Sequence, residues 1–409
     1  MAKNAKWTFM VYMAGNNTLS SAGDSDLGEM RNVGSTPDVN IAVQFENAGP
    51  EATRRFFIRD GPNDDVKNLG KTDGGDPDVI RAFIDWAVGT YPADRYALVL
   101  WNHGGGWAPD DFDQYAKNLR APAFTRGEAA YMGKSRLKKA LFSTTLKTVL
   151  QKPQKERAIC VDDSTGHSLD TIELGHVAAH AKDRIGHKLD ILGMDACLMS
   201  NLEVAYEVAP YVSYLVSSEE EEPGDGWPYN TVLKAFNNKP GASPAHLTSA
   251  VVKAYIDFYK KAGQSGVTQS AFALEKIENT AKSVDALGNA LAGHMPDAAK
   301  EISTAIKRSK SFFYKQLWDI NQFSKEITKA TSDSKVKAAA RDVQAAIKPG
   351  SANFVLSKAG IGSSYATCGG LSVYLIPPLE DVSKYYGDLA FTKEYPNWQK
   401  MLQNYLTHW

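Results

Sequence analysis

Cysteine is scarce in this sequence, and neither sign of charge is in excess. The 409 residues include only Cys160, Cys197 and Cys368, too few for a disulfide-based scaffold. These cysteines lie 37 and 171 residues apart, which excludes a CxxC zinc or redox pair. Lys and Arg number 46 against 47 Asp and Glu, so the net charge of −1 gives no global attraction to nucleic acid or anionic membranes.

Long apolar runs are also missing, because no segment approaches the ~20 apolar residues needed to cross a bilayer. The run at residues 7–15 follows a basic start, but it contains Thr8 and Tyr12 and ends at Asn16. We interpret this run as a buried strand rather than a signal peptide. The sequence therefore predicts a cytoplasmic protein, unless a leader has been removed, with neither a membrane nor nucleic acid as partner.

Strand and helix patterns alternate along most of the chain. Three apolar runs are typical of strands buried on both faces: residues 7–15, 95–101 and 189–194. Helical patterns follow several strands: residues 20–32, 76–87, 170–182 and 201–208. Two further strands, at residues 40–45 and 53–59, form a predicted hairpin or edge pair. This alternation predicts an α/β fold with parallel strands and covering helices.

Composition changes at two places along the chain. Residues 112–157 form a basic insertion with 11 Lys or Arg and 3 Asp or Glu. Beyond about residue 266 helical patterns dominate. We therefore predict an α/β domain at residues 1–265 and a mixed, helix-rich subdomain at residues 266–409.

Two predicted strands end in residues suited to nucleophilic catalysis. One leads to His103 and three glycines, and another leads to Cys197, 94 residues later. Because parallel strands end at one edge of a sheet, this imidazole and this thiol can meet. The imidazole can take the thiol proton or stabilise the thiolate. The backbone N–H groups of Gly104 and Cys197 can then hold the oxyanion of an acyl-transfer intermediate.

Each of these motifs alone has an ordinary structural explanation. A cysteine after an apolar strand is usually a small buried hydrophobe, and His-Gly-Gly-Gly can be only a turn. Their shared placement at strand ends is what favours catalysis. Cys160 and Cys368 have no such placement and are predicted to be core thiols.

Four stretches of the sequence resemble the clostripain-like cysteine peptidases, relatives of caspases and gingipains. They are WTFMVYMAGNNTL (7–19), ALVLWNHGGGW (97–107), LDILGMDACLMSNLEVAYE (189–207) and EEPGDGWPY (221–229). The resemblance implies a caspase-like α/β/α sandwich with a mostly parallel sheet. It also implies that His103 is the general base, that Cys197 is the nucleophile, and that cleavage follows basic residues. Such chemistry requires no cofactor, although the resemblance allows calcium.

Acidic residues near Cys197 fit a pocket for a basic side chain. Asp195 lies two residues before the thiol and Asp225 lies 28 residues after it. A carboxylate at the bottom of a pocket would pair with Arg or Lys, so we assign both to substrate binding. Asp195 can instead cap the next helix, and Asp225 can be a turn residue. The run Glu219–Glu222 is predicted to be a solvated acidic rim.

The basic insertion is a candidate for self-cleavage. Its 11 Lys and Arg residues, among them Arg120, Lys138 and Lys139, would suit a protease that cuts after basic residues. The alternative is a solvent-exposed insertion with no processing role. Nucleic-acid binding is disfavoured because no stacking aromatic residues interleave the basic ones.

Metal-binding motifs are weak. His176 and His180 lie one helical turn apart, but no zincin motif accompanies them, which favours an ordinary exposed helix face. The segment Asp162–Gly166 resembles a calcium loop, yet its spacing does not fit an EF-hand. We therefore expect no metal ligands.

Two other function classes compete with a peptidase. The His103–Trp107 segment resembles the oxyanion motif of lipases, but the chain lacks the Gly-x-Ser-x-Gly elbow that an α/β-hydrolase esterase needs. A non-catalytic, peptidase-like module that binds peptides is the other alternative. The presence of both His103 and Cys197 disfavours it.

Overall fold

A nine-stranded sheet forms the centre of the molecule in the computed structural model of the chain. The structure describes residues 4–48, 53–59, 64–107, 160, 168–313, 315–377, 381–383 and 385–408. The strands follow the order β10-β8-β7-β6-β5-β1-β2-β3-β4. Their bounds are β1 Ala5–Gly15, β2 Val39–Asn47, β3 Arg54–Phe57, β4 Asp65–Asn68, β5 Ala93–Trp101, β6 Leu189–Asp195, β7 Val212–Ser217, β8 Val267–Ala273 and β10 Val355–Ile361.

The middle of the sheet is parallel and its two sides are antiparallel. β2, β1, β5, β6 and β7 pair in parallel, whereas β3, β4, β8 and β10 join through antiparallel pairs. β1 lies inside the parallel part with ten of its eleven residues buried, which explains its uninterrupted apolar sequence. The predicted edge pairing of residues 40–45 with 53–59 is confirmed as β2 with β3.

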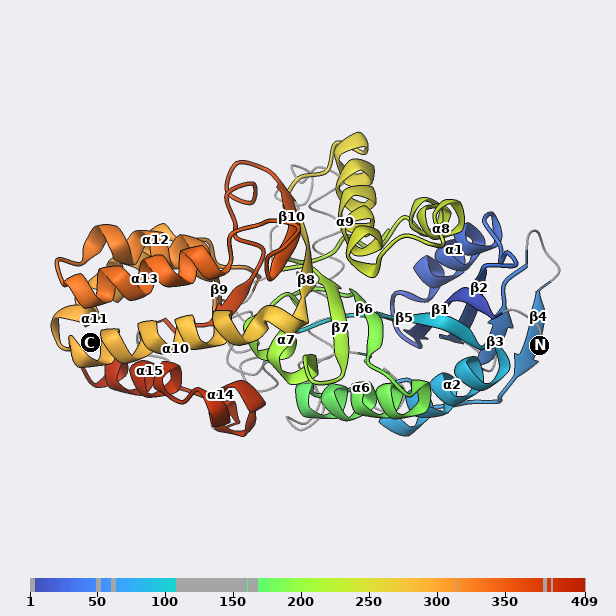
Figure 1. Cartoon of the computed structure of the whole chain (residues 1–409), viewed down its shortest axis with the longest axis horizontal. Helices are drawn as coiled ribbons and strands as arrows, with labels where there is room; N and C mark the ends of the chain where they lie inside the picture. The colour runs from blue at the N-terminus through green and yellow to red at the C-terminus, as the bar shows by residue number, and fades with distance from the viewer. Residues whose placement is uncertain are drawn as a thin grey trace, which may run out of the picture.

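Helices cover both faces of the sheet and bury two separate apolar clusters. One face carries α1 (Ser20–Arg31), α8 (Tyr229–Asn238) and α9 (Pro244–Lys261). The other face carries α2 (Pro77–Thr90), α6 (Thr171–Ile185) and α7 (Leu202–Val208). Figure 1 shows these two helical layers on opposite sides of the strands. This arrangement confirms the predicted α/β/α sandwich.

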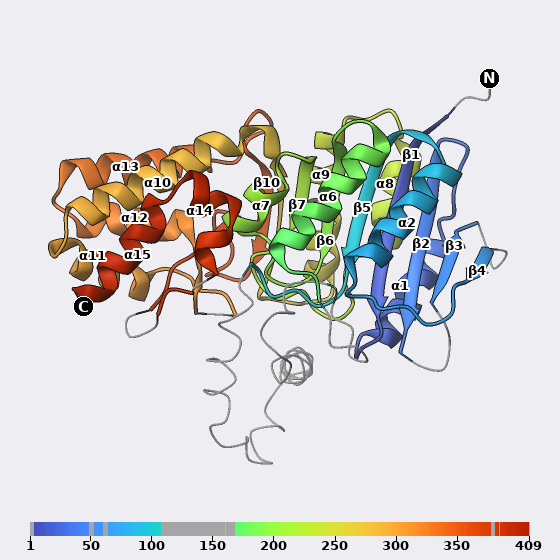
Figure 2. The same cartoon turned by 90° about the horizontal axis from the view of Figure 1, so that it is seen from below.

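The last third of the chain is mainly helical and packs against the same core as α2, α6 and α7. Figures 1 and 2 both show its helices gathered at one end of the molecule. The helices are α10 Ile277–Gly293, α11 Asp297–Arg308, α12 Ile320–Ala330, α13 Ser334–Ala346, α14 Ala390–Glu394 and α15 Asn397–Thr407. The short helix η1 (Leu274–Lys276) precedes α10, and η2 (Tyr386–Asp388) precedes α14. β9 (Leu317–Asp319) pairs with β11 (Ser372–Tyr374) in a separate two-stranded sheet.

The predicted division near residue 266 falls inside the large sheet. β8 and β10 belong to the segment that the sequence assigns to a second subdomain, yet β8 pairs with β7 and with β10. The division into residues 1–265 and 266–409 therefore stays a prediction. Among the described residues, no helix combines the length and apolar character needed to cross a membrane.

Candidate active site

The ends of β5 and β6 place the predicted catalytic segments side by side. These strands pair in parallel, with Trp101 opposite Asp195 at the last position of the ladder. The backbone N–H of Asn102 continues the pairing by donating to the Asp195 carbonyl over 3.2 Å. The residues that follow each strand, His103 on one side and Cys197 on the other, therefore emerge at the same edge of the sheet.

Gly104 lies against the backbone of Cys197. A Cβ atom at Gly104 would fall under 3.0 Å from both the nitrogen and the carbonyl oxygen of Cys197. A real Cβ atom essentially never lies so close to backbone, so only glycine allows this approach. The structure thus brings the predicted oxyanion-binding segment into contact with the predicted nucleophile.

A network of asparagine side chains fixes the end of β5 against the end of β1. The Asn102 amide donates to the Ala14 carbonyl, and its side-chain oxygen accepts from the His103 backbone. Asn17 also donates to the Ala14 carbonyl, over 3.0 Å. All three polar residues are buried, so these hydrogen bonds hold the turn that carries His103.

The Cys197 thiol contacts the backbone of Glu222. The Glu222 N–H donates to Sγ at 3.3 Å, and Sγ lies 3.8 Å from the Glu222 carbonyl oxygen. Only 5% of Cys197 is exposed. Burial raises the pKa of the thiol well above its ordinary value, and the nearby Glu221 carboxyl raises it further.

The His103 imidazole is buried as well, with 7% of the residue exposed. Burial lowers the pKa of His103 to about 4, because a cation is poorly solvated there. At neutral pH the imidazole is therefore uncharged and able to accept a proton. A neutral imidazole and a neutral thiol are not a preformed thiolate–imidazolium ion pair.

A pocket opens beside Cys197 at this edge. Its lining residues come from the ends of β5 and β6, the turn before α1 and the loop after Glu221: Leu19, Trp101, Asn102, Asp195, Ala196, Cys197, Glu222, Pro223, Gly224 and Gly226. Asp195, one of the two predicted binding residues, thus lies in the pocket wall. Its carboxylate accepts from the Tyr229 hydroxyl at 2.8 Å and from the Trp227 N–H at 3.2 Å.

Asp225 lies at the rim of this pocket rather than in its wall. It is exposed, and it sits between two lining residues, Gly224 and Gly226. The structure therefore brings Asp195 into the pocket wall and leaves Asp225 between two of its lining glycines.

Asp26 is a buried acid that the sequence analysis missed. Its carboxylate accepts from the Trp101 indole at 2.7 Å. A Cβ atom at Gly226 would lie 3.4 Å from Asp26 Oδ2 and 3.1 Å from both Asp195 oxygens, so the two carboxyl groups flank the same glycine. Burial, reinforced by the charge of Asp195, raises the pKa of Asp26 to about 9. The available signal was its position four residues before Met30, on the apolar side of the predicted helix.

The prediction of a solvated rim at Glu219–Glu222 is wrong. All four glutamates are buried, with between 1% and 9% of each residue exposed. Backbone hydrogen bonds to Thr268 and to Cys197 hold this segment across the core, from the end of β7 to the thiol. Burial and the charge of Asp195 raise the pKa of Glu222 well above its ordinary value. The acidic composition of this segment predicted exposure to solvent, but the segment runs between two buried parts of the structure.

The remaining candidate residues either have ordinary structural positions or lie outside the described residues. His176 is exposed and His180 pairs with Asp85 at 3.0 Å on the surface of α6, as expected of a helix face. Cys160 and Cys368 are buried free thiols, which confirms them as core residues. The basic insertion at 112–157 and the calcium-like segment Asp162–Gly166 lie outside the described residues.

Comparison with known proteins identifies a family whose model matches residues 11–409. The profile of the clostripain family, Peptidase_C11, matches residues 11–151 and 146–409. Clostripain from Hathewaya histolytica is 26% identical over 263 residues, which cover 56% of this chain and 42% of clostripain. The chain thus spans about two fifths of the length of that relative.

Two solved structures share the fold over nearly their full lengths. One is a secreted C11 cysteine protease from Bacteroides thetaiotaomicron in complex with an irreversible peptide inhibitor. It has a TM-score of 0.66 and 20% identity, covering 96% of this chain and 99% of that one. The other is an inactive zymogen C11 protease from Parabacteroides distasonis. It has a TM-score of 0.67 and 18% identity, covering 97% and 99%.

Proposed function

Because this chain belongs to the clostripain family of cysteine peptidases, we propose that it is an endopeptidase that cleaves peptide bonds after Arg or Lys. One observation carries the proposal. The ends of β5 and β6 bring the His103–Gly104 backbone against Cys197, beside a pocket with Asp195 in its wall. Family membership also removes the reason to consider an α/β-hydrolase esterase.

In the proposed mechanism His103 acts as general base and Cys197 as nucleophile. The neutral imidazole takes the proton from Sγ as the sulfur attacks the substrate carbonyl. The N–H groups of Gly104 and Cys197 donate to the oxyanion. The imidazolium then protonates the leaving amine, and water hydrolyses the thioester.

The pocket would select the residue before the cleaved bond. Asp195 is buried there, and Asp225 lies exposed at its rim. A guanidinium or ammonium group in this pocket would form a charge-assisted hydrogen bond with the buried Asp195 carboxylate, which water screens little, whereas water screens its attraction to the exposed Asp225. The resemblance to the clostripain-like peptidases also implies cleavage after basic residues.

Four fluorogenic peptides that differ only in Arg, Lys, Asp or Phe before the cleaved bond test the proposal. We expect hydrolysis of the Arg and Lys peptides alone, and its loss in Cys197→Ala and His103→Ala. Hydrolysis that survives Cys197→Ala would remove the assigned nucleophile. The buried, protonated thiol favours the alternative of a non-catalytic module that binds peptides. Tight binding of these peptides without hydrolysis would support that alternative.

Self-cleavage within residues 112–157 is the second part of the proposal. Its 11 basic residues separate His103 from Cys197 in the sequence, and both groups are buried in the intact chain. Active protein should yield two fragments on a denaturing gel, whereas Cys197→Ala should stay whole. Equal fragmentation of both proteins would contradict self-processing.

We propose that the proteolytic step itself needs no cofactor, because thiol, imidazole and backbone amides supply every required group. Assays with a chelator and with added calcium check this point; a strict calcium requirement would contradict it.

A cytoplasmic location remains a prediction, although the Bacteroides thetaiotaomicron neighbour is a secreted protease. Immunoblots of the cell and culture-medium fractions would decide the location.

A further inference from the structure

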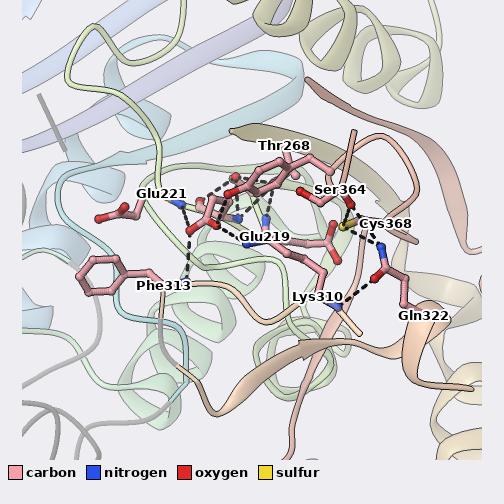
Figure 3. Close-up of polar contacts among 11 residues, drawn as sticks. Glu219, Glu221, Thr268, Lys310, Phe313, Gln322, Ser364 and Cys368 are labelled. Carbon is pink, nitrogen blue, oxygen red and sulfur yellow. Dashed lines mark hydrogen bonds and ion pairs between the residues drawn. The ribbon is translucent and has the colours of Figure 1, made fainter. Parts of the chain in front are cut away.

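A second polar cluster lies away from the pocket, where three buried side chains converge. Glu219 follows β7, Asp319 ends β9, and Cys368 lies in the loop before β11. One donor atom from each, a carboxylate oxygen or Sγ, lies within 4.8 Å of the other two. Figure 3 shows Glu219 and Cys368 side by side, with Glu221 directed away from them.

Glu219 is the unusual member of this cluster. Only 1% of the residue is exposed, and within the described residues neither carboxylate oxygen has a hydrogen-bond partner of normal geometry, although the Gly370 backbone and the Asp319 carboxyl lie close enough to influence the pKa of Glu219. A buried carboxylate with such incomplete hydrogen bonding is costly, and a bound cation would offset that cost. The Glu219 side chain is directed toward Cys368 and Asp319.

The other two members are oriented by neighbouring groups. Asp319 accepts backbone hydrogen bonds from Gln322, at 2.6 Å, and from Gly369. Cys368 Sγ lies 3.4 Å from the Ser364 carbonyl and accepts from the Gln322 amide at 3.6 Å. Groups that hold donor atoms in place in this way surround metal ligands in proteins.

We propose that Glu219, Asp319 and Cys368 form a binding site for a zinc-class divalent cation. Two carboxylates and a thiolate suit zinc, whereas the sulfur disfavours magnesium and calcium. Tetrahedral zinc would place these donors roughly 3.3–3.6 Å apart. Donor atoms that lie within 4.8 Å of one another would therefore have to approach by up to about 1.5 Å when the ion binds. The ion would displace the thiol proton to solvent and form a metal–sulfur bond, and water would complete the coordination.

The surrounding charge fits this proposal. A divalent ion with one thiolate and two carboxylates carries a net charge of −1. The Lys358 ammonium, which acts electrostatically on both carboxyl groups, can balance that charge. Its Nζ donates to the carbonyl oxygens of Cys368 and Ala366, so it lies at the border of the cluster.

The ion would join parts of the chain that are distant in sequence. Glu219 begins the buried acidic segment that reaches Cys197, whereas Asp319 and Cys368 belong to the last third of the chain. A metal here would therefore cross-link the last third to the segment beside the thiol. The site lies outside the proposed dyad, and its test does not depend on proteolysis.

The experiment uses the full chain carrying Cys197→Ala, which removes the proposed catalytic thiol as a metal ligand and prevents self-cleavage. After removal of metal with a chelator, the protein is incubated with Zn²⁺, and bound zinc is measured by mass spectrometry. We expect one equivalent of bound zinc and a higher melting temperature. With Co²⁺ we expect a thiolate-to-cobalt absorption band.

Cys368→Ser in the same background should abolish the cobalt band and reduce zinc binding at least tenfold, whereas the matched control Cys160→Ser should retain both. Glu219→Gln should weaken zinc binding without removing the band. If Cys368→Ser does not fold, bound zinc and the cobalt band in the parent protein, and weaker zinc binding in Glu219→Gln, still test the proposed site. A parent protein without a cobalt–thiolate band or bound zinc overturns the proposal, as does an unchanged band in Cys368→Ser. Either result would favour a proton shared between Glu219 and Asp319.

Discussion

At the residue scale, more carboxyl side chains lie around the pocket than one salt bridge with a substrate would require. Asp26, Asp195 and Glu222 are all buried around it, and each has a raised pKa because burial disfavours its charged form. A cation in the pocket would relieve that penalty by favouring the ionised carboxylates. The proposed preference for basic side chains would draw on this gain, because a bound cation would offset the cost of ionising buried carboxyl groups.

Asp195→Asn should reduce kcat/KM for an Arg peptide about 30- to 1,000-fold, because removing one partner of a buried charge pair costs about 2–4 kcal/mol. Asparagine keeps an oxygen that can accept from Trp227 and Tyr229, so the fold should persist. Asp342→Asn, on the exposed face of α13, is the matched control and should leave kcat/KM unchanged. An equal loss in both variants would exclude the assigned role.

The pH dependence follows from the same carboxyl group. Burial raises the pKa of Asp195 to about 6, so its charge is present above that pH and lost below it. We expect kcat/KM for basic peptides to fall as pH decreases through about 6, and again near pH 4 as His103 is protonated. The upper inflection should be absent in Asp195→Asn. Identical profiles for the two proteins would assign it to another group.

At the element scale, the end of β5 must pass close to the end of β6. Gly104 makes that approach, while hydrogen bonds from Asn102 and Asn17 hold the end of β1 in place. The predicted oxyanion donors depend on this contact between two loops, each anchored by a strand of the parallel sheet.

Gly104→Ala should destabilise the protein by about 1–3 kcal/mol and remove activity, because the new methyl group would overlap the Cys197 backbone. Gly28→Ala in α1 is the control: a Cβ atom there meets nothing within 4 Å, and alanine favours a helix by about 0.5–1 kcal/mol. Thermal melts and peptide hydrolysis measure both effects. A fully active, stable Gly104→Ala protein would contradict the close contact.

At the scale of the whole molecule, the last third of the chain completes the structure of the first part. β8 pairs with β7, and helices after residue 276 bury their apolar faces in the cluster that also contains α6 and α7. Ser200 links the two parts directly, because its carbonyl oxygen accepts from the Ser372 N–H at 2.9 Å.

A fragment of residues 1–265 should therefore fail to fold independently. It would lose β8 and β10, leave the edge of β7 unpaired and expose one side of the core. Size-exclusion chromatography and a urea titration followed by circular dichroism would compare it with the full chain carrying Cys197→Ala. A monomeric fragment with a cooperative transition would instead support the predicted boundary at residue 265.

Local patterns in the sequence determined most of the helices and central strands. Asp170 and Glu173 form the predicted capping box of α6, and Pro77 begins α2 after the Asp76 cap. These features act over a few residues, so sequence alone specifies them. The meeting of His103 and Cys197 segments was predictable too, because parallel strands end at one sheet edge.

Only the tertiary structure decided where the acidic residues lie and how distant segments pair. β9 lies in a stretch with helical patterns and becomes a strand because it pairs with β11, more than 50 residues away. Asp26 and the Glu219–Glu222 segment are acidic, and acidic residues in a sequence usually predict exposure to solvent. The structure buries all of them. Their burial depends on partners from other elements, such as Trp101 and Thr268, whose proximity no local pattern encodes.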